Sequence, residues 1–222
     1  MQTGALPHAR KPQPIATAVF LSGGGSNLQG VIDAVCANAL PLELRLVVSN
    51  NPDAFGLARA RAAGIPTAVY EFARARDDRA QYGAMLARKV EDCGVRLVLL
   101  LGWMHVFAPE FLNRGFDVLN LHPAYLPEDP DADSVTFPDG TVTPAFRGAR
   151  ALRDAIAAQV PAVGASLIAI TQRVDRGRLL ARQPMTLHPG EEEAAALERL
   201  HAVEREVVRA GVLRWIAEQE HP

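Results

Sequence analysis

The ten residues "FLSGGGSNLQ", numbers 20–29, end an apolar run and begin a segment with helical spacing. The run over residues 15–22 is short and apolar, as a buried strand requires. The apolar residues of 26–37 recur at i, i+3, i+4 and i+7, which is typical of a helix packed on one face. Three glycines followed by Ser-Asn therefore occupy a strand–turn–helix junction.

A junction of this kind can hold an anion, because its N–H groups are unpaired and the helix dipole is positive there. The dinucleotide pattern G-x-G-x-x-G fails, since Leu28 stands where the third glycine belongs. A P-loop starting at Gly25 reaches Gly30 but finds no lysine. The loop thus fits one small phosphate. A tight turn that uses glycine only for backbone freedom, with Ser26 as a helix cap, explains the same residues.

The remaining chain continues to alternate strand and helix. Strands are expected at 42–50, 65–71, 95–102, 116–123, 163–170 and 178–187, and helices at 51–64 (capped by Asn51 or Asp53), 77–93, 149–158 and about 190–218. This order predicts an α/β fold with one domain, residues 15–222, built on a mostly parallel open twisted sheet of the Rossmann-like type with helices on both faces. Residues 1–14 are expected to be a flexible N-terminal extension, and the acidic segment 128–143 to turn through a hairpin at 138–140.

Composition excludes several classes of function. The 222 residues carry a formal net charge of −2, which gives no basic surplus for binding nucleic acid. No stretch is apolar for long enough to span a membrane. The two cysteines form no C-x-x-C pair, which favours a reducing cytoplasm, and no His, Cys or Asp cluster has metal-ligand spacing.

Polar residues are expected to gather where parallel strands end, since ligands bind beyond the carboxyl ends of such sheets. In the strand at 116–123, Asn120 and His122 share a face and could stabilise an oxyanion. Asp175, in a turn between two later strands, could orient and charge His122. A hydrogen-bonded pair that caps the strand, and an aspartate that stabilises its own turn, are the structural alternatives.

Four stretches in this order resemble the formyltransferase family that uses 10-formyltetrahydrofolate: "LSGGGSNLQGVIDA", "LLLGWMHVFAPEFL", "VLNLHPAYLP" and the late "VDRG". The likeness covers about residues 16–215. The phosphate loop resembles that of members that formylate the amine of 5'-phosphoribosylglycinamide (GAR) in purine biosynthesis. The resemblance implies 10-formyltetrahydrofolate as co-substrate, no metal, small-molecule partners only, and a monomer or homodimer.

The resemblance also implies a role for individual residues. The catalytic trio would be Asn120, His122 and Asp175, with the Asn120 amide and a protonated His122 stabilising charge on the formyl oxygen. The other implied residues are Gly25, Ser26 and Asn27 for the substrate phosphate, Gly102, Met104 and Glu204 for the substrate, and Arg79, His105, Val106 and Phe107 for the folate.

The chain departs from the family pattern at several positions. His105 stands where an arginine is common, Trp103 replaces a phenylalanine, and Ile168 replaces a frequent histidine. Arg176 and Arg178 alter the Asp-Gly-Gly-Pro pattern and are expected beside the pocket mouth.

Alternatives to GAR formylation are another folate-dependent formyltransferase, a formyltetrahydrofolate deformylase, or an inactive relative that binds folate or phosphate. His188 and His201 are expected to be surface or packing residues.

Overall fold

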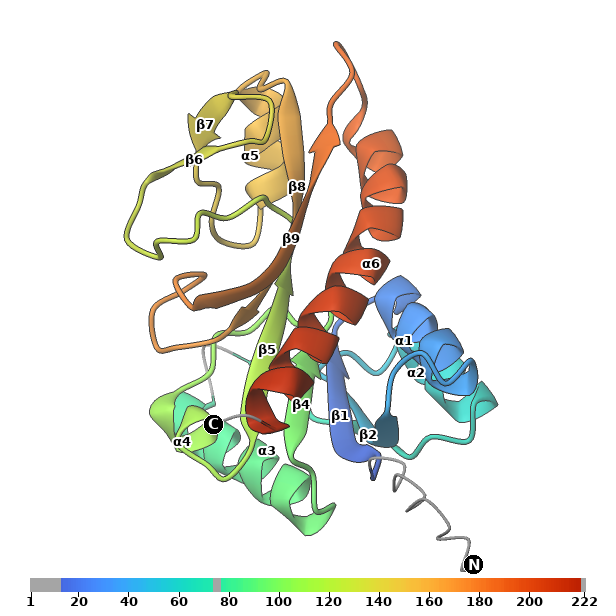
Figure 1. Ribbon diagram of the computed structural model, residues 1–222. Helices are drawn as coiled ribbons and strands as arrows, with labels where there is room; N and C mark the ends of the chain where they lie inside the picture. Colours follow the sequence, from blue (N-terminus) through green and yellow to red (C-terminus); the bar gives the residue numbers. More distant parts are fainter. Residues whose placement is uncertain (1–12, 74–76, 221–222) are drawn as a thin grey trace, which may run out of the picture.

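A computed structural model describes residues 13–73 and 77–220, so most of the expected N-terminal extension lies outside the described residues. The central sheet has seven strands in the order β3-β2-β1-β4-β5-β8-β9 (Figure 1). Their bounds are β1 Ile15–Leu21, β2 Leu42–Ser49, β3 Thr67–Val69, β4 Leu97–Leu100, β5 Asp117–His122, β8 Ala162–Ala169 and β9 Arg178–Thr186. β1 to β5 are parallel, β8 pairs antiparallel with β5, and β9 pairs antiparallel with β8, so β8 alone is reversed in this sheet and the mostly parallel sheet is confirmed.

Helices cover both faces of this sheet because apolar side chains alternate along its inner strands. On β1, Val19 and Leu21 belong to one core cluster, and Ala18 and Phe20 belong to the other. The first cluster is covered by α1 (Ser26–Cys36), α2 (Phe55–Ala62), α5 (Ala151–Ala157) and α6 (Glu193–Glu220); the second is covered by α3 (Arg79–Asp92) and α4 (Pro109–Leu112). The expected hairpin forms as a small antiparallel sheet, β6 (Ser134–Thr136) with β7 (Val142–Pro144).

The expected cap of α2 is wrong, and Ser26, the alternative cap of α1, does not cap its helix either. The cap of α2 is Ala54, with no side-chain hydrogen bond, because Asn51 Oδ1 accepts from the Asp53 N–H at 3.0 Å and forms a turn ahead of the helix. The cap of α1 is Gly25, in the left-handed region at φ +70°, and Ser26 is the first helical residue. Glycine is required at this position because its backbone conformation is strained for other residues.

The carboxyl ends of β1, β4 and β5 lie side by side at one edge of the sheet (Figure 1). The chain leaves β1 toward β2 on one side and returns to β4 on the other, so a switch in strand order falls between β1 and β4. Crevices at such switch points are the usual ligand sites of open α/β sheets. The glycine loop, residues 102–105 and residues 120–123 all belong to this edge, as the sequence predicted.

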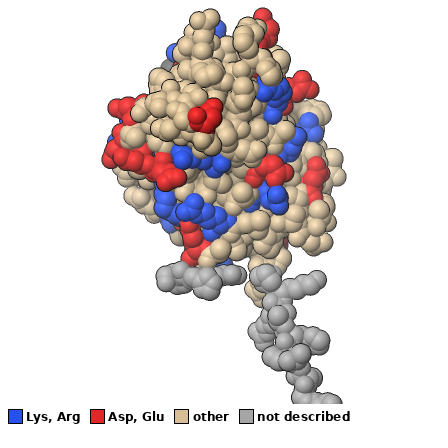
Figure 2. Space-filling model, turned by 45° about the horizontal axis from the view of Figure 1, so that its top comes forward, with Lys and Arg blue, Asp and Glu red and all other residues tan. Residues whose placement is uncertain are grey.

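Acidic and basic side chains are interspersed on the face shown in Figure 2, in keeping with the small net charge. None of the helices within residues 13–73 and 77–220 is both long and apolar enough to cross a membrane.

Candidate active site

A cavity of about 490 Å³ opens at the carboxyl ends of β1, β4 and β5. Its walls are residues 23–27, 100–107 and 120–123, the start of α5, the loop between β8 and β9, and one face of α6. Every site residue expected from the sequence lines this cavity except Arg79. Segments from both ends of the chain therefore meet around one space.

The three expected catalytic side chains converge on the carboxylate of Asp175. The Asn120 amide nitrogen donates to Asp175 Oδ1 at 3.4 Å, and His122 Nδ1 lies 3.5 Å from Asp175 Oδ2. Asp175 can reach them because β8 pairs with β5 in a register that places Ile168 opposite Asn120, and the chain leaves β8 just after this pair to form the loop that carries Asp175. Its backbone takes a positive φ of 51°, an uncommon conformation for a residue other than glycine. The structure therefore brings the three side chains together.

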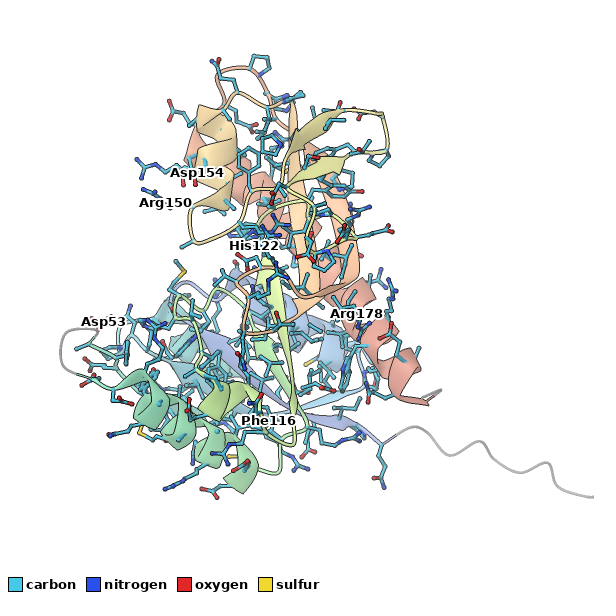
Figure 3. All side chains as sticks on the ribbon, turned by 90° about the vertical axis from the view of Figure 1, so that its left-hand side faces the viewer. Asp53, Phe116, His122, Arg150, Asp154 and Arg178 are labelled. Carbon is cyan, nitrogen blue, oxygen red and sulfur yellow. The ribbon has the colours of Figure 1, made fainter. Side chains whose placement is uncertain are left out.

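Hydrogen-bond acceptors face both ring nitrogens of His122. Nδ1 faces Asp175, and Nε2 lies 2.9 Å from the backbone carbonyl of Phe146. Only the doubly protonated ring has an N–H to donate to each acceptor. With 4 % of its surface exposed, His122 is shielded from bulk water, and it lies at the middle of the molecule in Figure 3.

The segment 146–148 contacts His122 and Asp175, and no sequence pattern predicted its role. In addition to the Phe146 carbonyl, the Gly148 N–H donates to Asp175 Oδ2 at 2.7 Å. Arg147 donates to the Asp175 carbonyl at 3.3 Å and to the Ala132 carbonyl at 2.8 Å. Arg147 thus ties the acidic segment to the loop that carries Asp175, and its desolvation lowers the pKa of its guanidinium.

The glycine loop presents its amides to the cavity. Among the described residues, no backbone or side-chain acceptor pairs with the N–H groups of residues 24–27. Unpaired amides at the start of a helix are suited to an anion. On the same wall, Asn27 Nδ2 donates to Glu204 Oε2 at 2.7 Å, and Asn27 Oδ1 is buried without a partner in the described part of the chain.

Glu204 is a buried acid on the cavity wall. Its exposed fraction is 5 %, and desolvation raises the pKa of its carboxyl above the usual value despite the hydrogen bond from Asn27. His201 lies one turn earlier on α6 and also lines the cavity, which corrects its expected place at the surface or in packing. Burial and the nearby Arg205 lower the pKa of His201. The shared face of Leu197, His201 and Glu204, at spacings of four and three, could have identified it.

Aromatic side chains form the opposite wall. Phe107 stacks on Phe111 with ring centroids 3.9 Å apart and on Trp103 at 5.6 Å, whereas Met104 and Val106 expose about half of their surface. His105 Nε2 lies 2.8 Å from the amide nitrogen of Asn50. This wall can cover a flat apolar ring system.

Three arginines lie elsewhere than the sequence suggested. Arg79 begins α3 and is exposed, so the structure does not bring it to the cavity. Arg176 and Arg178, expected beside the pocket mouth, are not among the residues that line the cavity: Arg176 donates to Asp133 of the acidic segment, and Arg178 donates to Glu218 of α6. Both pair with carboxylates that sequence spacing cannot reveal.

Ile168 is fully buried on β8, in register with Asn120, and supports the strand without reaching the cavity. The cavity wall does include three arginines that no sequence pattern predicted: Arg150, Arg153 and Arg173. Within the part of the chain that the structure describes, His, Cys, Asp and Glu side chains form no group of three able to hold a metal ion.

Comparison with known proteins gives consistent matches. Residues 16–135 match the formyl transferase family. The phosphoribosylglycinamide formyltransferase of Escherichia coli is 31% identical over 201 residues, covering 90% of this chain and 86% of that protein. The enzyme of the same name from Schizosaccharomyces pombe is 30% identical over 218 residues, covering 91% of this chain and 97% of that protein. The crystal structure of glycinamide ribonucleotide transformylase 1 from Symbiobacterium toebii superposes with a TM-score of 0.80 at 28% identity, covering 94% of this chain and 90% of that one.

Proposed function

The chain belongs to the formyl transferase family, and from this membership and its cavity we propose that it transfers the formyl group of 10-formyltetrahydrofolate to the amine of GAR. The observation that carries the proposal is the meeting of two features in one cavity: a carboxylate that gathers Asn120 and His122, and a loop of unpaired amides. The domain that performs this reaction comprises residues 15–222. Both cysteines are free, as suits a protein of the cytoplasm.

The glycine loop holds the phosphate of the acceptor. The amides of Gly25, Ser26 and Asn27 supply donors aimed at one anion, and the start of α1 adds the favourable end of its dipole. Gly102 and Met104 line the path from this loop to the trio, and Glu204 faces the same path with a carboxyl that can accept or donate a hydrogen bond. Anchoring a remote phosphate fixes the amine beside the formyl carbon and lowers the entropic barrier.

The trio stabilises the charge that develops when the amine attacks. Negative charge builds on the formyl oxygen and positive charge on the nitrogen. The Asn120 carboxamide has two N–H donors, so it can hold Asp175 with one and offer the other to the formyl oxygen. His122 supplies the second donor: we infer that the formyl oxygen takes the place of the Phe146 carbonyl at Nε2.

Asp175 holds the Asn120 and His122 side chains in position. Its carboxylate lies beside His122 Nδ1 and orients the ring, and the Gly148 amide fixes the carboxylate itself. The surplus proton of the attacked amine leaves through a water molecule, with Asp175 as the nearest base. The bond between the formyl carbon and N10 of the folate then breaks, and N10 takes up a proton as tetrahydrofolate leaves. On the other wall, His105, Val106 and Phe107 cover the folate ring system, and Arg79 is assigned to the outer end of the folate by resemblance alone.

The test is an assay of the purified protein with 10-formyltetrahydrofolate and GAR, in which tetrahydrofolate and formylated GAR are quantified together. Equal amounts of both products are expected. Formate release without GAR would indicate a deformylase. Thermal stabilisation by GAR with no product would indicate an inactive binding protein.

A further inference from the structure

The amides of the glycine loop need a fixed direction if they are to hold a phosphate, and α2 supplies it from behind the loop. The Gly56 N–H donates to the Gly23 carbonyl at 3.1 Å. Arg59 Nε donates to the Gly24 carbonyl at 3.0 Å, and its Nη1 reaches the Gln29 side-chain oxygen at 3.4 Å. Two successive carbonyls of the loop therefore point toward α2.

The peptide group is planar and trans, so each N–H points opposite to the preceding carbonyl. With the Gly23 and Gly24 carbonyls turned toward α2, the N–H groups of Gly24 and Gly25 face away from it. The cavity lies on that other side, because residues 23–27 line it whereas no residue of Phe55–Ala62 does. The contacts of α2 thus direct these amides into the cavity.

Close packing leaves the loop little room to turn. A Cβ on Gly25 would lie 2.5 Å from the Cα of Gly56, so the two backbones are in direct contact. Gly23 and Gly24 have no atoms within 4 Å of an added Cβ, so side-chain packing does not hold them. Their orientation depends on the two carbonyl contacts, of which only that from Arg59 comes from a side chain.

We propose that Arg59 is a positioning residue for the acceptor: it fixes the direction of the loop amides and thereby sets the affinity for the phosphate. The inference rests on the proposed function, in which this loop binds the phosphate of GAR. Arg59 does not touch the phosphate itself, because its guanidinium occupies the face of the loop opposite the cavity.

The experiment compares Arg59→Met, which keeps the stem and removes the donors, with Arg59→Lys, which keeps one donor, and Arg61→Met. Arg61 is a matched control: it lies on the same helix, is exposed, and its guanidinium makes no hydrogen bond or ion pair with another described residue. The readouts are kcat, KM for GAR, KM for 10-formyltetrahydrofolate, and competitive inhibition by inorganic phosphate.

In Arg59→Met we expect KM for GAR and the inhibition constant of phosphate to rise together by about tenfold, the effect of losing one charge-assisted hydrogen bond. kcat and KM for the folate should stay unchanged, Arg59→Lys should recover most of the loss, and Arg61→Met should match the parent protein. Unchanged phosphate inhibition in Arg59→Met would overturn the inference. So would a fall in kcat with both KM values raised alike, because that pattern indicates a general structural role.

Phosphate binding also separates the two proposals. If the parent protein forms no formylated GAR yet binds inorganic phosphate, as measured by thermal shift, the proposed function fails, and a weaker shift in Arg59→Met still supports the inference. If the parent transfers the formyl group and Arg59→Met binds phosphate normally, the inference alone fails.

Discussion

Replacing Asp175 by asparagine tests the trio, because every neighbour of that carboxylate is a hydrogen-bond donor. Oδ2 accepts from the Gly148 N–H and faces His122, and Oδ1 accepts from Asn120. A carboxamide has only one accepting end. Its NH2 group must face either Asn120 or the pair formed by His122 and Gly148, and the donor it meets turns away from its present position.

The size of the effect follows from these contacts. Two unit charges 3.5 Å apart attract by about 5 kcal/mol at an effective dielectric constant of about 20, and desolvation offsets part of this. Losing one pre-aimed donor at a developing oxyanion costs about 3–4 kcal/mol, or roughly 10²–10³ in kcat. We therefore expect Asp175→Asn to lower kcat by about 10²–10³ while KM for GAR changes little, since the phosphate loop is untouched.

Steady-state formyl transfer measures both quantities. Asp53→Asn is the matched control, because Asp53 is exposed and Figure 3 shows it well away from His122. Circular dichroism melts establish that both variants fold. A folded Asp175→Asn protein with kcat within threefold of the parent would refute the assignment of the trio.

Three further predictions concern the cavity and the segments near it. Gly25→Ala and Gly64→Ala place a side chain at nearly the same positive φ, but only the side chain at position 25 also meets another backbone. Urea unfolding should show that Gly64→Ala lowers the free energy of unfolding by about 1–2 kcal/mol and that Gly25→Ala lowers it further. Equal losses in the two variants would be inconsistent with this packing. Because burial raises the pKa of Glu204, the stability that its protonated carboxyl contributes is complete below the unfolded pKa and is lost as the pH rises through the folded pKa. Glu204→Gln should therefore have a higher Tm than the parent protein at pH 8, and the difference in Tm should shrink toward pH 4. A difference in Tm that does not depend on pH would contradict burial as the cause. Arg147→Met should lower Tm by about 5 °C, which corresponds to about 2 kcal/mol of unfolding free energy for a chain of this size. Arg178→Met removes an exposed ion pair and should lower Tm by less than half of that. Similar shifts of Tm in the two variants would argue against the special role of Arg147.

The sequence predicted the framework of the site because that framework depends on local sequence patterns. The glycine loop, the shared face of Asn120 and His122, and the position of both at strand ends follow from periodicity and from the geometry of parallel sheets. The turn that carries Asp175 was predicted from the residues, and its catalytic role was implied by the family resemblance. Its approach to Asn120 and His122 depends on the pairing of β5 with β8, which local spacing does not reveal.

The contacts that the sequence did not predict are mostly made by backbone groups or by side chains that are distant in the sequence. The Phe146 carbonyl and the Gly148 amide are groups that every residue type carries, so no side-chain pattern marks them. The partners of Arg147 and Arg176 lie far along the chain and depend on how the acidic segment folds back. His201, by contrast, shares a helical face with Glu204, and that signal was present in the sequence.

The hydrogen bond from Asn27 to Glu204 joins residues 177 positions apart and has a consequence for the timing of biosynthesis. Ribosomes deliver the amino-terminal βα unit first, so a nascent chain has its glycine loop long before α6 emerges. Until that last helix docks, the Asn27 carboxamide lacks its acidic partner and the acceptor pocket lacks a wall. The complete cavity therefore forms only after α6 has been synthesised and has docked.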